Sequence, residues 1–327
     1  MNTYMPVGKT RFVNYLNKVQ TILDRAELAE NPAQLIYEED MRTPLFRLEG
    51  LSRLYKKINN HKKLKKLNEI FKDIEDRLGA IDFYDGFYKE FINEKKIPGL
   101  ITIYLKEKKG EKLEDLNHYL KEENWISKHK KRLEKIHKDL DEIKWLDEKN
   151  DTIAILDVYH DDIKKVIKKY KRKNRQFLDI ENDVHEFRRQ LRWLSIYPQA
   201  LGGLMQLKSN PEPPEFLKKY LTPEIVNSPF NVMPDGSALE YHIMLNANYF
   251  YALSWMIAEL GKLKDNGLKV TLLEQSIADV YKTKEDVEQL VYSICDENQK
   301  TIPQILERSK KLAATFFSEN ILANIIA

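Results

Sequence analysis

The stretch from Asp183 to Tyr197, DVHEFRRQLRWLSIY, repeats its apolar residues with the period of an α-helix. Steps of three and four residues place these residues on one helical face. They are Val184, Phe187, Leu191 and Leu194. The same steps place His185, Arg188 and Arg192 on the adjoining face, with Arg189 beside them. The pattern predicts an amphipathic helix with a basic edge, capped at its start by Asp179 or Asp183.

The basic edge of this helix points to binding rather than to catalysis. A guanidinium group can donate a pair of hydrogen bonds to phosphate or carboxylate, and an imidazole adds a titratable donor. Three such side chains in a row can therefore hold an extended row of acceptor oxygens. The alternative interpretation is an ordinary helix face whose basic residues pair with acidic residues of a neighbouring helix.

The rest of the composition favours an all-α protein. Helix-forming residues dominate the 327 residues, Gly occurs only 11 times, and a hydrophobic content of 42% suffices for a core. The length fits one large domain or two ordinary ones. Because 54 basic residues nearly balance 51 acidic ones, the net charge of +3 argues against a protein that coats nucleic acid with its whole surface. A local basic cleft remains compatible with this balance.

Cysteine usage and hydropathy predict a soluble protein of the cytoplasm. Cys295 is the only cysteine, which excludes an intramolecular disulfide and a thiolate metal cluster and fits a reducing compartment. We expect it to be a small buried side chain. The N-terminal residues lack the apolar run of a signal peptide, and no stretch reaches about 18 uninterrupted apolar residues.

Apolar periodicity predicts helices along most of the chain, with interruptions at prolines and glycines. Pro44 requires a kink or a restart, and Pro98-Gly99 and Lys109-Gly110 mark breaks. Six prolines between Ser209 and Gly236 predict an irregular segment with one short turn at Phe216–Tyr220. We interpret this segment as an insertion on the surface, with a lid as the alternative. The predicted helices span about 9–28, 33–58, 64–78, 113–145, 152–177, 239–264, 268–281, 284–296 and 302–324, with Thr283 and Thr301 as caps of the last two.

The most basic segment of the chain is IKKVIKKYKRKNRQF. In a helix its cations fall on the side opposite part of the apolar face. They are Lys164, Lys168, Lys171 and Arg175. Solvent exposure is the simpler interpretation of such a run, and a polyanion site is the alternative.

An internal repeat relates the two halves of the chain. When Arg42 is placed over Arg188, Glu39 falls on His185, Phe46 on Arg192 and Leu48 on Leu194. Downstream, Leu78-Gly79-Ala80-Ile81-Asp82 is similar to Leu260-Gly261-Lys262-Leu263-Lys264-Asp265. The second pair lies farther apart in sequence than the first, and most of the difference falls at the proline-rich segment. We therefore predict an N-terminal half, residues 1–178, and a C-terminal half, residues 179–327, with an insertion at about 209–236.

The motif H-x-x-R-x-x-x-R-[RWK]-L followed by L-G-x-x-[KR]-D, present twice in a helical chain, resembles the CHAD family. The second half matches at His185, Arg188, Arg192-Trp193-Leu194 and Leu260-Gly261-x-x-Lys264-Asp265, and the first half at Arg42, Arg47 and Leu48. The resemblance covers most of the chain from about Leu35. It implies two pseudo-symmetric up-and-down helical bundles that together bind inorganic polyphosphate in a basic central groove.

The resemblance and the basic edge together define candidate polyanion-binding residues, namely His185, Arg188, Arg192, Arg189, Arg42, Arg47, Arg53 and Lys264. Several positions depart from the family pattern, since Glu39, Phe46, Glu49 and Ser195 stand where basic residues or histidine are usual. Glu39 can pair with Arg42 along a helix, and Glu49 with Arg53, which would neutralise part of the first half.

The predicted function is therefore non-catalytic binding of inorganic polyphosphate or a similar polyanion, in the cytoplasm and with polyphosphate granules as a candidate location. The alternative is a helical scaffold or protein-interaction module that has lost this ligand. No enzyme, cofactor or metal is predicted, because H-E-x-x-H, G-x-S-x-G and ExExK motifs do not occur. His242 with Asn246, and His160 with Asp161 and Asp162, could ligate a metal, but such histidines are more often ordinary hydrogen-bonding groups. Nucleic acid is disfavoured as a partner, because Trp and Tyr lie in apolar faces and not among the lysines.

Overall fold

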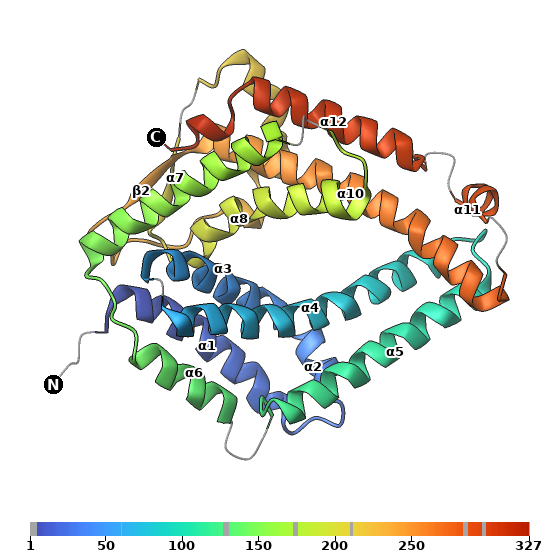
Figure 1. The fold of residues 1–327 in the computed structure, drawn as a ribbon, viewed down its shortest axis with the longest axis horizontal. Coiled ribbons are helices and arrows are strands. Elements are labelled where there is room, and N and C mark those ends of the chain that lie inside the picture. The colour runs from blue at the N-terminus through green and yellow to red at the C-terminus, as the bar shows by residue number, and fades with distance from the viewer. Residues whose placement is uncertain are drawn as a thin grey trace. The chain divides into compact units, whose positions relative to one another are not determined.

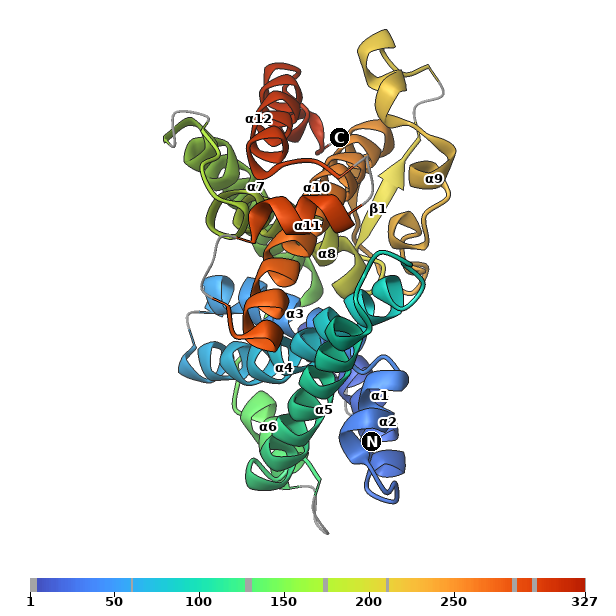
Figure 2. The ribbon, with the colours of Figure 1, turned by 90° about the vertical axis from the view of Figure 1, so that its right-hand side faces the viewer.

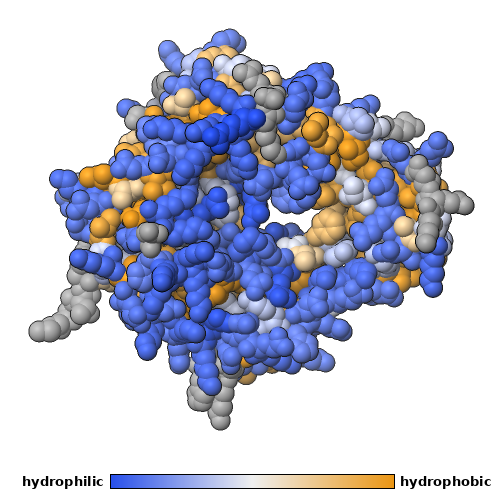
Figure 3. Space-filling model, viewed as in Figure 1, coloured by the Kyte–Doolittle hydropathy of each residue, from blue (hydrophilic) through white to orange (hydrophobic). Residues whose placement is uncertain are grey.

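The computed structural model describes residues 5–59, 61–126, 131–172, 176–209, 212–283, 287–295 and 299–326. This part of the chain is mainly helical (Figure 1), as the composition predicts. Hydrophilic side chains cover most of the face shown in Figure 3. The chain forms two compact units that are each discontinuous in sequence: unit 1 comprises Met1–Met5, Lys9–Trp145 and Lys269–Gln299, and unit 2 comprises Pro6–Gly8, Leu146–Leu268 and Lys300–Ala327. The predicted boundary at residue 178 divides the chain once into two continuous halves, whereas each of these units consists of three segments of the chain.

Unit 1 is built around the long helix α4, which packs against α3 and α5. Apolar residues recur at helical spacing along α4, and Leu64, Phe71 and Leu78 among them are fully buried. Aromatic rings of Phe12, Tyr55 and Trp145 form a second cluster, with centroids 5.2 to 5.8 Å apart. The helices of this unit are α1 (Val7–Ala26), α2 (Pro32–Glu38), α3 (Arg42–Asn59), α4 (Lys62–Phe91), α5 (Gly99–Glu122), α6 (Lys131–Asp141), the end of α10 and α11 (Glu288–Ile294).

Unit 2 contains the predicted basic-edged helix, α8 (Glu186–Ala200), packed against α7 (Glu148–Arg172). The Tyr159 hydroxyl of α7 donates to the Leu194 carbonyl at 3.0 Å. Near the end of α7, the rings of Tyr170, Phe187 and Phe317 pack together, and the Tyr170 and Phe317 centroids are 4.0 Å apart. The other elements are η1 (Ile180–His185), β1 (Met205–Lys208), η2 (Glu215–Tyr220), α9 (Pro223–Val226), η3 (Pro229–Asn231), β2 (Ile243–Asn246), the first part of α10 (Ala247–Tyr281), α12 (Ile302–Ser318) and η4 (Leu322–Asn324).

Two of the predicted helix boundaries are wrong in unit 1. Helix α5 runs through Gly110 without a break, so Lys109-Gly110 does not interrupt it. The helix predicted over residues 113–145 is instead the end of α5 and the separate helix α6. Asn124 adopts φ of 58°, the left-handed conformation that ends helices, and the following Trp125 turns into the core with no exposed surface.

The helix predicted over residues 239–264 is also partly wrong. Residues 239–242 are neither helix nor strand, and Ile243–Asn246 form β2, which pairs in parallel with β1 so that Met205 is the partner of Ile243 (Figure 2 shows β1). In β2 the side chains of Ile243 and Leu245 are buried and Met244 is exposed, which is the two-residue period of a strand. Helix α10 then continues to Tyr281 and includes the helix predicted separately at residues 268–281.

Other local predictions are confirmed. The chain restarts between α2 and α3, with Asp40 at φ of 51°, and places Pro44 in the first turn of α3, where proline is tolerated. Short helices occupy the proline-rich segment, including a 3-10 turn at Glu215–Tyr220. Whether this segment is an insertion stays a prediction. Thr301 caps α12, while Lys284, the predicted start of the preceding helix, lies outside the described residues.

Candidate functional site

The basic-edged helix begins with one wide π-helical turn, η1, that leads directly into α8. Asp179 caps this turn by accepting a hydrogen bond from the Asn182 amide at 2.5 Å, as predicted. π-Turns of this kind occur frequently at functional sites. The predicted apolar face is buried at Val184, Phe187, Leu191 and Leu194. The local sequence therefore places its basic side chains on the less buried side of the helix.

His185 and Arg189 lie next to carboxylates of their own helix. The His185 Nδ1 atom is 2.7 Å from Oε1 of Glu181, one turn earlier. Arg189 Nη1 is 4.0 Å from Oε2 of Glu186, a contact at the limit of an ion pair. Neither acidic partner is predicted from the sequence, although their three- and four-residue separations are those of neighbours on a helix.

Arg188 lies against the backbone of α10. Its Nε atom donates to the Ile257 carbonyl at 3.1 Å. A Cβ atom at Gly261 would lie 3.1 Å from the same Nε, so this glycine permits the close approach. Burial lowers the pKa of Arg188, and the nearby Asp265 carboxylate partly opposes that shift. Among the described residues, no carboxylate forms an ion pair with this guanidinium.

Arg42 makes the corresponding contact in unit 1 but is neutralised. Its Nη2 would lie 2.9 Å from a Cβ atom at Gly79, so each unit places an arginine against a helix glycine. The Arg42 Nε donates to Glu75 at 2.8 Å, and Nη1 donates to Asp82 at 2.6 Å. Two carboxylates thus neutralise the charge of Arg42, whereas Arg188 has no ion pair among the described residues.

The remaining predicted site residues all have partners. Lys264 Nζ lies 2.7 Å from Asp265, and its side chain is 18% exposed. Burial lowers the pKa of Arg47, which lies beside Tyr15. Arg53 and Arg192 are half-buried and each interacts with other groups. The structure thus brings His185, Arg188, Arg189 and Arg192 to one helix, and it places Arg42, Arg47 and Arg53 in the other unit.

Glu39, which the sequence repeat aligns with His185, pairs with Arg25. The predicted pairing of Glu39 with Arg42 is replaced by this contact and by the bonds of Arg42 to α4. Glu49 is buried, with 2% of its surface exposed. These acidic groups therefore belong to the interior and to the ion pairs of unit 1.

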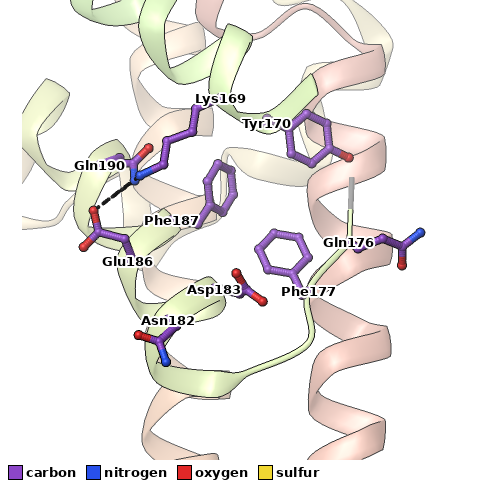
Figure 4. A pocket seen from close by; sticks show the side chains of 9 residues that line it. All are labelled: Lys169, Tyr170, Gln176, Phe177, Asn182, Asp183, Glu186, Phe187 and Gln190. Carbon is purple, nitrogen blue, oxygen red and sulfur yellow. Dashed lines mark hydrogen bonds and ion pairs between the residues drawn. The ribbon is translucent and has the colours of Figure 1, made fainter. Parts of the chain in front are cut away.

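A small hollow lies between the end of α7 and the start of α8 (Figure 4). Three aromatic rings line it, those of Tyr170, Phe177 and Phe187, together with the carboxylates of Asp183 and Glu186. Its volume of about 20 Å³ holds about one water molecule. The acidic lining and the small size are unsuited to a phosphate chain.

A second, open hollow of about 490 Å³ lies on α7 itself. Its lining consists of Lys164, Ile167, Lys168, Lys171 and Arg172. The cations in it are exposed, as the simpler interpretation of this basic segment predicts. Arg175, which was predicted on the same face, lies outside the described residues.

His242, which could ligate a metal together with Asn246, has a hydrogen-bonding partner in the backbone. His242 Nε2 lies 3.0 Å from the Gly236 carbonyl. Within the described ranges, no group of three or more His, Cys, Asp or Glu side chains is placed to hold a metal ion. Cys295 is buried, and its burial raises the pKa of the thiol. Over the same residues, no helix has the length and apolar character needed to cross a membrane.

No family model, no curated protein and no solved structure matches this chain. The resemblance to the CHAD family therefore rests on the sequence motifs alone.

Proposed function

We propose that this protein binds inorganic polyphosphate or a similar polyanion without catalysis, and that Arg188 on α8 is central to the site. The observation that carries the proposal is the partly buried Arg188 guanidinium, which has a hydrogen bond to one carbonyl and no ion-paired carboxylate among the described residues. A cation removed from water without a counter-charge is unfavourable, and an anionic oxygen would offset that cost. A guanidinium has five N–H donors, so four remain after the bond to Ile257.

The neighbours of Arg188 on the same helix extend the proposed site. Arg192 follows one turn later and His185 precedes it by three residues, so phosphate oxygens along α8 could meet successive donors. Lys264 adds a cation on α10, where it is held by Asp265. In this proposal Arg42, Arg47 and Arg53 contribute little, because unit 1 pairs Arg42 with carboxylates.

The shared contact of arginine with glycine supports a second part of the proposal, that the two units are diverged copies of one helical bundle. Arg42 meets Gly79 and Arg188 meets Gly261, which are the pairs that the sequence repeat aligns. In unit 1, Glu75 and Asp82 would then have turned the arginine of the repeat, Arg42, from a ligand-binding group into part of an internal ion pair. We further propose that the protein acts in the cytoplasm, with polyphosphate granules as a candidate location.

The experiment is a titration of the protein with long-chain inorganic polyphosphate at several salt concentrations. We expect the affinity to fall steeply between about 50 and 200 mM salt, as it does for proteins that bind phosphate polymers. Arg188→Gln should weaken binding by about tenfold to a hundredfold, because a charge-assisted hydrogen bond contributes about 1.5 to 3 kcal/mol. Arg188→Lys should bind with intermediate affinity, since it keeps the charge and loses the paired donors.

Arg42→Gln is the matched comparison, because it removes the same group from the corresponding contact in unit 1. We expect it to lower thermal stability, since Glu75 and Asp82 lose their partner, and to change affinity less than threefold. A wild-type protein that does not bind polyphosphate at low salt would remove the proposal. Equal effects of the two substitutions on affinity would remove the assignment to Arg188.

The alternative function is that of a helical scaffold or protein-interaction module. It is favoured by two exposed apolar side chains in the proline-rich segment, Phe230 at 70% and Val232 at 66% exposure. Affinity capture with the full chain distinguishes the two functions. A stoichiometric protein partner that survives polyphosphatase treatment and is lost in Phe230→Ser would support the scaffold, whereas a partner released by polyphosphatase would support polyanion binding.

A further inference from the structure

The C-terminal third of α7 and the residues after it concentrate positive charge. Between residues 163 and 178 the chain has eight basic residues and no acidic residue. The net charge of the whole chain is only +3, so the remainder is net acidic. The acidic residues of α7, including Glu148, Asp151 and Asp162, all lie before this segment. The helix therefore has a sharply divided charge distribution.

Four of these cations share one face. Lys164, Lys168 and Arg172 follow one another at intervals of four residues, and Lys171 lies beside them at an interval of three from Lys168. The rise of an α-helix spreads this row over about 12 Å. All four side chains are exposed, and with Ile167 they line the open hollow on α7.

Lys165 and Lys169 of the same helix are paired, whereas these four cations have no ion-pair partner among the described residues. Lys165 Nζ lies 3.8 Å from Asp162, and Lys169 Nζ lies 3.7 Å from Glu186. No carboxylate among the described residues lies within ion-pair distance of the four cations in the hollow. Like charges at a spacing of four residues repel each other in a helix. Lys171 and Arg172 are favoured by the negative end of the helix dipole, whereas Lys164 and Lys168 lie farther from it.

The chemistry of this face suits a chain of phosphates. Lysine ammonium groups bind phosphate as point charges without demanding one geometry, and the row provides successive contacts for a flexible polymer. Single-stranded nucleic acid would require exposed aromatic rings for base stacking. The exposed aromatic side chains of the described residues, Phe216, Phe230 and Tyr281, lie on other elements.

We propose that Lys164, Lys168, Lys171 and Arg172 form a second docking surface for a linear polyphosphate chain, separate from Arg188. The inference rests on the proposed function for its ligand class. It assigns a binding role to a helix that carries neither of the repeated sequence motifs.

The test compares two triple variants of the full chain that lose the same charge. Lys164→Gln/Lys168→Gln/Lys171→Gln removes unpaired cations of the hollow. Lys218→Gln/Lys262→Gln/Lys311→Gln removes lysines of the same unit that already pair with Glu215, Glu259 and Glu307. Glutamine and lysine have similar helix propensities, so both variants should fold and unfold like the wild type.

With long-chain polyphosphate at low salt, we expect the first variant to bind at least tenfold more weakly and the second to change less than threefold. The slope of log affinity against log salt should fall by about 2 in the first variant, because each lost phosphate contact contributes about 0.7. Lysine modification of the wild type, followed by mass spectrometry, provides a check that needs no substitution. Polyphosphate should protect Lys164, Lys168 and Lys171 from the reagent.

The outcomes separate this inference from the proposed function. If the wild type does not bind polyphosphate, both fail. If Arg188→Gln weakens binding while the two triple variants behave alike and the three lysines are not protected, only the surface on α7 is wrong. If the first triple variant weakens binding and Arg188→Gln does not, the surface on α7 stands and the site at Arg188 is wrong.

Discussion

Arg42 and Arg188 show how surroundings decide the role of a residue. Both lie in similar sequence motifs, and both approach a helix glycine. Arg42 donates to Glu75 and Asp82, and this pairing makes it a structural group. Arg188 reaches only a backbone carbonyl among the described residues, which leaves donors for a ligand. The sequence motif places an arginine at both positions. The groups around each guanidinium decide whether its N–H donors are available to a ligand.

Asp85 illustrates a structural ion cluster of unit 1. Its carboxylate is 3% exposed and lies 2.6 Å from Lys89 and 2.9 Å from Lys109. The Tyr37 hydroxyl donates to it at 2.7 Å. Burial raises the pKa of Asp85, but the hydrogen bonds from Lys109, Lys89 and Tyr37 outweigh it and lower the pKa to about 2. The ionised form is therefore favoured by the fold.

We predict that Asp85 contributes pH-dependent stability. Because its pKa is lower in the folded than in the unfolded chain, the contribution is fully present above about pH 4 and is lost as the pH falls toward 2. The contribution at neutral pH is about 2 kcal/mol. Urea unfolding of wild type and Asp85→Asn at pH 7, 4 and 3 measures it. The difference between the two proteins should shrink below pH 4, and a difference that is constant over this range would contradict the assignment.

At the scale of elements, the local sequence predicts some helix ends correctly and others wrongly. Thr301 caps α12 through a reciprocal pair, in which its hydroxyl accepts from the Gln304 amide and the Gln304 side chain accepts from the Thr301 amide at 2.9 Å. Gly110, by contrast, does not end α5. The cap depends only on residues three positions apart, so it can be predicted from the local sequence. A single glycine destabilises a helix by only about 1 kcal/mol, so tertiary packing can keep the helix intact through it.

The cap on α12 gives a prediction for this element. Thr301→Ala should lower the free energy of unfolding by about 1 kcal/mol, because the Gln304 amide at the helix start loses its acceptor, the Thr301 hydroxyl. Thr315→Ala is the matched control, since Thr315 is exposed on the same helix and the change favours helix formation. Thermal and urea unfolding compare the two variants. Equal stability of both variants would show that the cap has no measurable effect.

At the scale of the whole molecule, unit 1 depends on a segment that comes late in the chain. Residues Lys269–Gln299 belong to it and supply Val270, Leu273, Ile277 and Val291, each with at most 2% of its surface exposed. Lys269 also binds Glu90 and Glu94, both at 2.7 Å. The core of unit 1 therefore cannot be completed by the first half of the sequence.

A fragment of residues 1–178, the predicted N-terminal half, should consequently not fold cooperatively. Each apolar side chain that it lacks contributes about 1.5 to 3 kcal/mol when buried, and the total stability of a domain is only about 5 to 15 kcal/mol. Circular dichroism during urea unfolding of the fragment and the full chain tests this. A fragment with a cooperative transition at the midpoint of the full chain would show that residues Lys269–Gln299 are dispensable for unit 1.

The sequence by itself determined the helical class, the apolar face of α8, a cap at Asp179 or Asp183 and the exposed basic face of α7, because these depend on residues within a few positions of one another. Only the tertiary structure decided that Arg42 is neutralised, since Glu75 and Asp82 lie 33 and 40 residues away. The same holds for the pairing of β1 with β2 and for the return of Lys269–Gln299 to unit 1. Such contacts form between distant segments, so helical periodicity carries no information about them.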